Sequence, residues 1–331
     1  MPIPETFAAF RIHNDEGGYR AGIEAVTLDQ LSPGEVVIRA VHSSVNYKDA
    51  LAGTGKGKIL RSFPLVGGID VAGHVVASTD ARFREGDPVL VTGRGLGESR
   101  DGGYAQYVRV DADMPVALPN GLDLREGMIL GTAGFTAALA LVRMVRNGQM
   151  PEMGPLAVTG ATGGVGSLAV DIFSAAGFEV HAISGKADQA AYLRELGASQ
   201  VLGRDALQTT RPLETARFGG GMDNVGGPML ASLLAQTAPY GNVGSAGLAA
   251  DHRIDATVMP LILRGVSLLG VASTEPPAEL RDEAWQRLAD DWKPRHLERI
   301  CTREATLEEL PAVFDTMLAG DSLGRTLVNL P

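Results

Sequence analysis

The stretch VTGATGGVGS (158–167) places three glycines, Gly160, Gly163 and Gly166, at even spacing. The preceding LAVT predicts a strand, the following SLAVDIFSAA predicts a helix, and GFEVHAIS predicts a second strand ending near residue 183. In that context the first glycine makes the sharp turn, the second lets the backbone approach a phosphate, and the third lets the helix pack on the strand. The helix N-terminus offers unpaired N–H groups to a pyrophosphate. The pattern favours a dinucleotide-binding loop over a glycine-rich turn without a ligand.

The end of the second predicted strand indicates which dinucleotide is bound. A site for NAD usually has an aspartate or glutamate about 20 residues after the loop. Here the position is held by Ser184-Gly185-Lys186, and Arg204 follows the next short apolar run. A hydroxyl, a backbone N–H and two cations suit a 2′-phosphate that a carboxylate would repel, so we expect NADPH. The alternative is that Lys186 and Arg204 are solvated surface charges.

The predicted secondary structure changes near residue 120. Short runs rich in valine and aromatic residues predict strands at 35–45, 70–78, 87–93, 102–110 and 114–119. A helix is expected over 124–145, and from residue 156 strands and helices alternate, which predicts a parallel sheet covered by helices. A length of 331 residues suits about two domains. The fold class is therefore α/β, with a β-rich domain before a doubly wound one.

Charge and cysteine content exclude several classes of protein. The formal net charge of −10 argues against nucleic acid or an anionic membrane as the main partner. A single cysteine, Cys301, rules out an intrachain disulfide framework and a cysteine-based zinc cluster. We see no secretory leader and no uninterrupted apolar span of about 18 residues, so we expect a cytoplasmic protein.

Six motifs spread over the chain resemble the medium-chain dehydrogenases/reductases: NYKD (46–49), PLVGGIDVAG (64–73), GDPVLVTG (86–93), DGGYAQYV (101–108), LGTAGFTA (130–137) and VTGATGGVG (158–166). NYKDAL, the SGK triplet and VMPLILRGVSLLGV are similar to the acrylyl-CoA reductases, which are also catalogued as quinone oxidoreductases. The resemblance implies a GroES-like catalytic domain over 1–124 and 272–331. It also implies a Rossmann NADPH-binding domain over 125–271, and usually a homodimer.

The metal ligands of the zinc-dependent members of this family are missing. Asn46-Tyr47 stands where a ligand cysteine would lie, Gly68-Ile69-Asp70 stands where His-Glu would lie, and GTAGFTA (131–137) also lacks a cysteine. Without soft ligands a tetrahedral zinc site cannot be built. We interpret His42 and His74, which lie in apolar strand-like runs, as structural, and we expect no metal.

The resemblance therefore implies metal-free reduction of a carbon–carbon double bond conjugated to the thioester of an acyl-CoA. Tyr47 is the candidate proton donor or hydrogen-bond donor to the carbonyl. The alternative role for Tyr47 is to pack against the nicotinamide of the cofactor. Lys48 and Asp49 would orient Tyr47, or pair with each other as a structural ion pair.

The remaining candidate residues bind the cofactor or the substrate. Those expected at the phosphates and the ribose are Gly160, Thr162, Gly163, Gly164, Val165, Gly166, Ser184, Gly185, Lys186 and Arg204. The resemblance alone places Leu248, Ile262, Ser273, Gly324 and Arg325 near the nicotinamide half. The basic loop GKGKILR supplies Lys56, Lys58 and Arg61 for the anionic CoA, unless it is only a solvated flap.

One departure and two alternative functions stay open. Asn224 in MDNVGG stands where the family resemblance implies a more apolar residue. A quinone reductase on the same fold also needs a hydride site without metal. A protein that binds NADPH without turning over a substrate is the third possibility.

Overall fold

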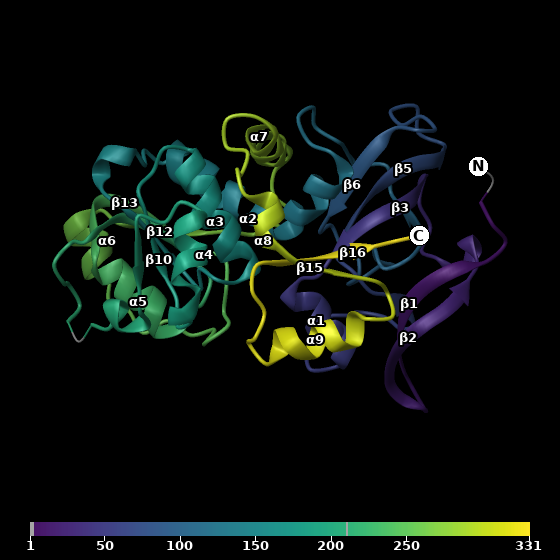
Figure 1. Cartoon of the computed structure of the whole chain (residues 1–331), viewed down its shortest axis with the longest axis horizontal. Helices are drawn as coiled ribbons and strands as arrows, with labels where there is room; N and C mark the ends of the chain where they lie inside the picture. The colour runs from purple at the N-terminus through teal and green to yellow at the C-terminus, as the bar shows by residue number, and fades with distance from the viewer. Residues whose placement is uncertain (1–2, 210) are drawn as a thin grey trace. The chain divides into compact units, whose positions relative to one another are not determined.

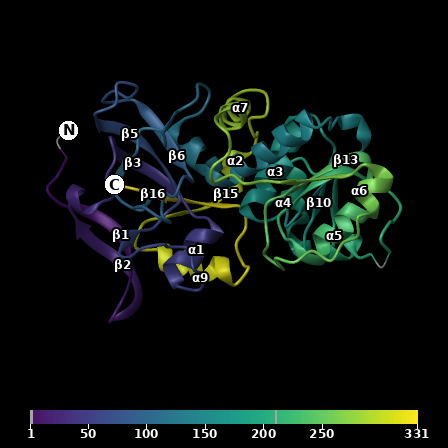
Figure 2. The same cartoon turned by 180° about the vertical axis from the view of Figure 1, so that it is seen from behind.

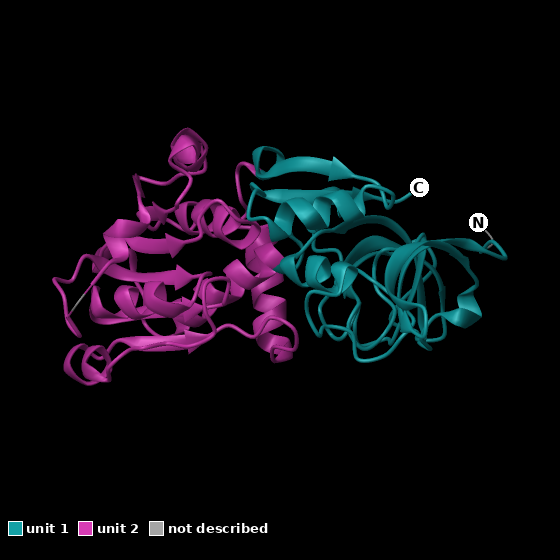
Figure 3. Cartoon of the chain, turned by 90° about the horizontal axis from the view of Figure 1, so that it is seen from below, with its two compact units in different colours: residues 1–132, 297–331 teal, residues 133–296 magenta. Residues whose placement is uncertain are grey.

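The computed structural model describes residues 3–209 and 211–331, and the chain divides into two compact units (Figure 3). Unit 1 comprises Met1–Thr132 and Leu297–Pro331, and unit 2 comprises Ala133–His296. The return to unit 1 thus lies later than the expected residue 272. The reason is α7 (Ala278–Ala289), whose Trp285 stacks on Phe135 at 5.6 Å between ring centroids. Glu283 of the same helix also accepts a hydrogen bond from Arg146 at 2.9 Å.

Unit 2 is built on a six-stranded parallel sheet in the order β11-β10-β9-β12-β13-β14. This order, with its reversal between β9 and β12, is that of the Rossmann fold, as the sequence predicts. The strands are β9 (Leu156–Thr159), β10 (Val180–Ile183), β11 (Gln200–Leu202), β12 (Phe218–Asp223), β13 (Thr237–Ser245) and β14 (Ser267–Gly270). The connecting helices are α3 (Gly164–Ala175), α4 (Ala190–Glu195), α5 (Gly227–Ala235) and α6 (Met259–Arg264).

Unit 1 contains a seven-stranded sheet and a three-stranded sheet. The larger has the order β15-β16-β3-β5-β6-β8, with β7 also paired to β3, and its pairs are antiparallel except β15 with β16. Its strands are β3 (Val36–Ser44), β5 (Asp70–Ser78), β6 (Pro88–Thr92), β7 (Tyr107–Val110), β8 (Val116–Ala117), β15 (Cys301–Ala305) and β16 (Arg325–Asn329). The smaller sheet joins β1 (Phe7–Asp15), β2 (Gly18–Val26) and β4 (Leu65–Val66).

The helices α1 (Tyr47–Thr54), α8 (Leu297–Ile300) and α9 (Leu310–Leu318) also belong to unit 1, together with the first part of α2 (Leu124–Arg146). Figures 1 and 2 show α1 and α9 side by side, although they are distant in the sequence. A Cβ at Gly53 of α1 would lie 2.2 Å from the Phe314 ring of α9, so glycine permits this close packing. Single 3-10 turns occur at Leu28–Gln30, Pro151–Met153, Ala187–Gln189 and Arg204–Leu207.

The strand predicted over 102–110 is shorter, because its first half serves as a tightly packed loop. A Cβ at Gly103 would lie 2.0 Å from the carbonyl oxygen of Asp70. Gly103 and Tyr104 instead donate their N–H groups to the carbonyls of Gly68 and Gly67. This loop therefore packs directly on the segment that leads into β5.

The long helix α2 (Leu124–Arg146) is kinked at Gly131, where φ is +47°. It is the one helix among the described residues that is long and apolar enough to cross a membrane, but most of its apolar stretch is buried inside the protein. The expectation of no apolar span near that length was thus too strict. The kink frees the N–H of Thr132 from the helix and directs it to Asp70 of β5.

Candidate functional site

The glycine loop in unit 2 has the conformation that the sequence predicts. Gly160 follows β9 with φ of +58°, which is the left-handed turn that favours glycine. A Cβ at Gly166 would lie 2.2 Å from the Gly160 carbonyl oxygen, so this position must be glycine for α3 to pack. Gly163 differs, because an added Cβ would make only one ordinary contact within the chain. Nothing in the fold requires glycine there, as expected where a backbone must leave room for a ligand.

The segment after β10 forms the second part of the candidate nucleotide site. The Ser184 hydroxyl accepts the Lys186 N–H at 3.0 Å and lies 3.4 Å from the buried Thr162 hydroxyl of the glycine loop. The Arg204 guanidinium lies against Gly185, where a Cβ would approach its Nε atom to 2.5 Å. The Arg204 guanidinium thus lies against the segment that carries the Ser184 hydroxyl and Lys186, and the residues directly after β10 are Ser184-Gly185-Lys186, without a carboxylate.

Asn224 lies where the sheet order reverses, at the end of β12 beside the glycine loop. Its Nδ2 donates to the Thr159 carbonyl at 2.9 Å, and its N–H donates to the Thr159 hydroxyl. Its Oδ1 is buried and has no hydrogen-bond partner in the structure. The crevice at such a reversal is where α/β folds bind dinucleotides. The open space at Gly163 and the orphaned Oδ1 thus fit a bound dinucleotide.

Four further cofactor candidates lie on separate segments. Leu248, in the loop after β13, and Ile262, on α6, are 67% and 71% exposed. Ser273, after β14, accepts a hydrogen bond from Thr136 at 2.8 Å. Gly324 belongs to unit 1 and makes a left-handed turn, with φ of +58°, directly before β16.

The expected catalytic residues Tyr47, Lys48 and Asp49 form the first turn of α1 in unit 1. Tyr47 is the first residue of this helix, and its side chain is 50% exposed. Lys48 does not pair with Asp49, which corrects one of our expectations, because its ammonium lies 2.7 Å from Glu98. Asp49 is buried instead and accepts the N–H groups of Asn46 at 2.8 Å and Ile69 at 3.0 Å. Burial and the charge of Asp70 raise the pKa of Asp49 to about 7, against the lowering effect of these N–H groups.

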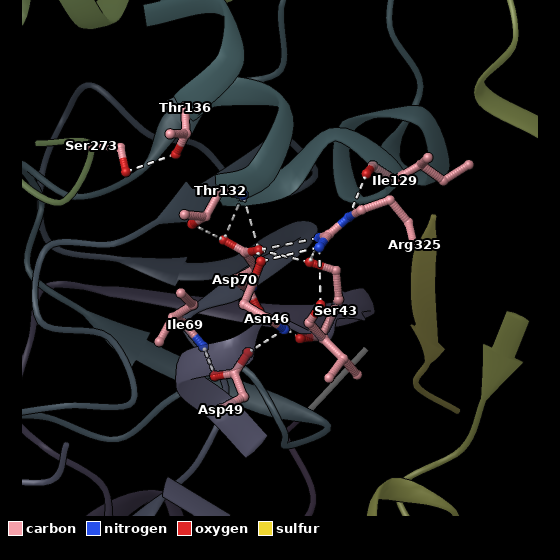
Figure 4. A network of polar contacts seen from close by, with 12 residues as sticks. Ser43, Asn46, Asp49, Ile69, Asp70, Ile129, Thr132, Thr136, Ser273 and Arg325 are labelled. Carbon is pink, nitrogen blue, oxygen red and sulfur yellow. Dashed lines mark hydrogen bonds and ion pairs between the residues drawn. The ribbon is translucent and has the colours of Figure 1, made fainter. Parts of the chain in front are cut away.

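Asp70 is the centre of a buried polar network that our sequence reasoning missed (Figure 4). Its carboxylate accepts hydrogen bonds from Ser44 at 2.7 Å, from the Asn46 amide at 2.7 Å, and from the Thr132 hydroxyl at 2.6 Å. The Arg325 guanidinium lies 3.8 Å from it. The sequence feature that could have indicated this network is the charged Asp70 at the start of an apolar strand, in GGIDVAG (67–73).

The network corrects the expectation that Arg325 binds the cofactor. The side chain is buried in unit 1, and each guanidinium nitrogen donates to a protein group. The acceptors are the Ile129 and Val45 carbonyls, the Asn46 amide oxygen and the Ser44 hydroxyl, at 2.7–3.1 Å. Four of the five N–H groups of Arg325 are thus bonded within unit 1, so its guanidinium serves the interior of this unit.

The proposed CoA-binding cations lie in the segment that follows α1. Lys56, Lys58 and Arg61 are all exposed, so nothing in unit 1 covers them. The Arg61 N–H donates to the carbonyl of Glu98, the residue that pairs with Lys48. This bond attaches the basic segment to the loop around residue 98.

The donor set does not fit a catalytic zinc ion. Within residues 3–209 and 211–331, no group of three histidine, cysteine, aspartate or glutamate side chains is arranged to hold a metal. The three segments that resemble the ligand-bearing ones present an amide, a carboxylate and a hydroxyl, already bonded to one another. A permanently charged guanidinium beside the carboxylate would repel a divalent cation.

Comparison with known proteins agrees with this arrangement. The family described as "Alcohol dehydrogenase GroES-like domain" matches residues 32–120, and the one described as "Zinc-binding dehydrogenase" matches residues 164–290. The acrylyl-CoA reductase AcuI of Ruegeria pomeroyi is 43% identical over 328 residues, which cover 98% of this chain and 99% of that protein. "Putative quinone oxidoreductase YhfP" of Bacillus subtilis is 43% identical over 326 residues, with 98% and 99% coverage.

Two solved structures are equally similar. The YhdH oxidoreductase of Salmonella enterica, in complex with NADP, has a TM-score of 0.94 at 44% identity and covers 98% of this chain and 100% of its own. YhfP of B. subtilis, with NAD bound, has a TM-score of 0.95 at 42% identity, with 99% and 100% coverage. The chain therefore belongs to the medium-chain dehydrogenase/reductase family, in the zinc-free group that includes the acrylyl-CoA reductases and YhfP.

Proposed function

We propose that this protein is an NADPH-dependent reductase of the carbon–carbon double bond of acryloyl-CoA, forming propanoyl-CoA. The likeness to proteins named acrylyl-CoA reductase, over nearly the whole of both chains, supports the substrate class. NADP and NADPH in two related structures support the cofactor. The observation in this chain that carries the proposal is the cluster of Ser184, Lys186 and Arg204 at the ribose end of the nucleotide site.

The residues of unit 2 would hold the cofactor by its charges. The N-terminus of α3 and the glycine loop present N–H groups to the pyrophosphate. Lys186 and Arg204 would pair with the 2′-phosphate, and the Ser184 hydroxyl would add a hydrogen bond. The orphaned Asn224 Oδ1 is suited to accept a hydrogen bond from a ribose hydroxyl, which would account for the amide at this position.

When bound, NADPH supplies a hydride to the β-carbon of the substrate, and a proton is added at the α-carbon. The residue that we assign to the proton or to the thioester oxygen is Tyr47, whose half-exposed side chain begins α1. We assign Lys56, Lys58 and Arg61 to the phosphates of CoA, because they are exposed cations on a short segment of an acidic protein.

The test is steady-state NADPH oxidation with acryloyl-CoA, crotonyl-CoA and a benzoquinone, compared by kcat/KM. We expect acryloyl-CoA to be the preferred substrate and propanoyl-CoA to be the product. A higher kcat/KM for the quinone would favour the function in the name of YhfP. NADPH binding without oxidation by any of the three would indicate a binding protein.

The cofactor is compared in the same assay, because one related structure contains NAD. We expect a much higher kcat/KM with NADPH than with NADH. Equal values for the two nucleotides would contradict the role of the Lys186 and Arg204 cluster.

A further inference from the structure

Three chain segments that resemble the ligand-bearing segments of zinc-dependent relatives meet at one carboxylate in this protein (Figure 4). They contribute Asn46 before α1, Asp70 at the start of β5, and Thr132 after the kink of α2. The Asp70 carboxylate accepts the Asn46 amide at 2.7 Å and the hydroxyl and N–H of Thr132 at 2.6–3.1 Å. It therefore makes the cross-link between segments that a metal ion would otherwise make.

The surroundings of Asp70 compensate the charge of its carboxylate. Asp70 is fully buried, and Arg325 supplies the opposite charge from β16 at 3.8 Å. Ser44 bridges the two, because its hydroxyl donates to Asp70 and accepts from Arg325, both at 2.7 Å. Removal of one member of such a pair leaves an uncompensated buried charge.

The link to Asn46 fixes the residue that directly precedes Tyr47. The Asn46 amide donates to Asp70, its Oδ1 accepts from Arg325 at 3.1 Å, and its N–H donates to Asp49. Its carbonyl accepts the N–H groups of Asp49 and Ala50 in the first turn of α1. The position of the Tyr47 backbone is thus defined by the network, whereas its side chain extends toward solvent.

We propose that Asp70 and Arg325 form a positioning centre that takes the place of the metal as the link between these segments, and that this centre sets the place of Tyr47. The inference rests on the proposed function for the role of Tyr47 in the reaction. Asp70 and Arg325 do not touch substrate; they act through Asn46. A small displacement of a reacting group can lower the rate by up to about a hundredfold.

The test uses the full-length protein labelled with 3-fluorotyrosine, in which the resonance of Tyr47 among six tyrosines is assigned with Tyr47→Phe. Thr132→Val removes one hydrogen bond to Asp70 at a residue that is joined to Tyr47 through Asp70 and Asn46. We expect the Tyr47 fluorine resonance to shift or broaden and kcat with acryloyl-CoA to fall about tenfold. NADPH affinity, followed by fluorescence titration, should not change. Thr132→Ser, which restores the hydroxyl, should restore both the resonance and kcat.

Asp70→Asn is the stronger variant, because the amide cannot accept the bonds of Asn46, Ser44 and Thr132 together. Asp101→Asn is the matched control, since Asp101 is also a buried carboxylate of unit 1, bonded to Ser32 and Val66. This control should leave the Tyr47 resonance in place even if it lowers stability. A parental Tyr47 resonance and kcat in Thr132→Val would overturn the proposal. If the parent does not reduce acryloyl-CoA, the proposed function fails. The Tyr47 fluorine resonance of the variants then still shows whether Asp70 and Arg325 set the position of Tyr47.

Discussion

Lys186 is the residue that we propose distinguishes NADPH from NADH, which lacks the 2′-phosphate. A charge-assisted hydrogen bond to that phosphate is worth about 1.5–3 kcal/mol. We therefore expect Lys186→Ala to raise KM for NADPH about tenfold or more and to leave KM for NADH nearly unchanged. Arg194→Ala, an exposed arginine of α4 in the same unit, is the control. An equal loss with both nucleotides would show that Lys186 supports the loop and does not bind the phosphate.

Tyr47 tests the chemical part of the proposed reaction. If its phenol donates the proton or a hydrogen bond to the thioester, Tyr47→Phe should lower kcat about a hundredfold. NADPH affinity should stay close to that of the parent, because phenylalanine fills the same space. Steady-state kinetics with acryloyl-CoA and a fluorescence titration with NADPH give both quantities. A kcat near the parental value would leave Tyr47 a packing residue.

The raised pKa of Asp49 predicts that the stability of the protein depends on pH. Its pKa is about 7 in the folded protein, against an ordinary value of 3.8. The folded state therefore holds a proton that the unfolded state has lost, and the contribution of Asp49 to stability falls as pH rises through this window. Asp49→Asn cannot titrate and loses one acceptor for the N–H groups of Asn46 and Ile69, which is a constant cost.

We expect the difference in the free energy of unfolding between parent and Asp49→Asn to shrink as pH rises from about 5 to 8. Urea denaturation at four pH values measures it. The groups that face Asp49 are Asp70, Tyr104, the Arg325 guanidinium, the Asn46 side chain and the Asn46 and Ile69 N–H groups. A difference that stays constant over this range would show that Asp49 is ionised throughout.

At the scale of elements, the kink of α2 depends on Gly131. A Cβ at this residue would lie 2.6 Å from the Asp70 carboxylate and 2.7 Å from the Ser44 hydroxyl, and its φ is positive. We expect Gly131→Ala to lower the free energy of unfolding by about 2–5 kcal/mol, from backbone strain and overpacking together. Gly320 also has a positive φ, but an added Cβ there would meet open space. Gly320→Ala therefore measures the backbone strain without overpacking. Urea denaturation of both should show the larger loss at Gly131.

The elements that could be predicted from the sequence are those with a local signal. The order of unit 2 was predictable, because each strand of the Rossmann unit ends at a glycine turn or a helix start, and the parallel sheet is confirmed. The hairpin of β1 and β2 was missed, although NDEGG (14–18) contains the turn residues that a hairpin needs. The helix α1 was not predicted, since NYKDAL carries no apolar periodicity.

The site was predictable only where one segment supplies the function. The glycine loop and the SGK triplet each lie within ten residues, so their geometry follows from local sequence. The Asp70 network joins residues 44, 46, 70, 132 and 325, and no local pattern connects them. Arg325 was assigned to the cofactor on the family resemblance alone, and a single arginine before a strand does not reveal whether its side chain points to a ligand or into the core.

At the scale of the whole molecule, exposed apolar side chains on unit 2 bear on the homodimer that the family resemblance implies. Val258, Ile262 and Leu263, on or beside α6, are 61–71% exposed, and Leu268 of β14 is 41% exposed. The strand β14 is the last in its sheet, so one of its edges has unpaired N–H and C=O groups. Exposed apolar side chains near an open strand edge are typical of an interface. We propose that two copies pair through this surface, which would give the homodimer that the family resemblance implies.

Ile262 decides between two uses of this surface, because it was also assigned to the cofactor. We expect Ile262→Glu to convert a dimer to a monomer in analytical ultracentrifugation and to leave NADPH affinity unchanged. The carboxylate would be buried without a partner in the pair, which costs several kcal/mol. Met150→Glu, at a 55% exposed methionine elsewhere in unit 2, should leave the parental mass in place. A dimer that survives Ile262→Glu while NADPH affinity falls would instead place Ile262 at the cofactor.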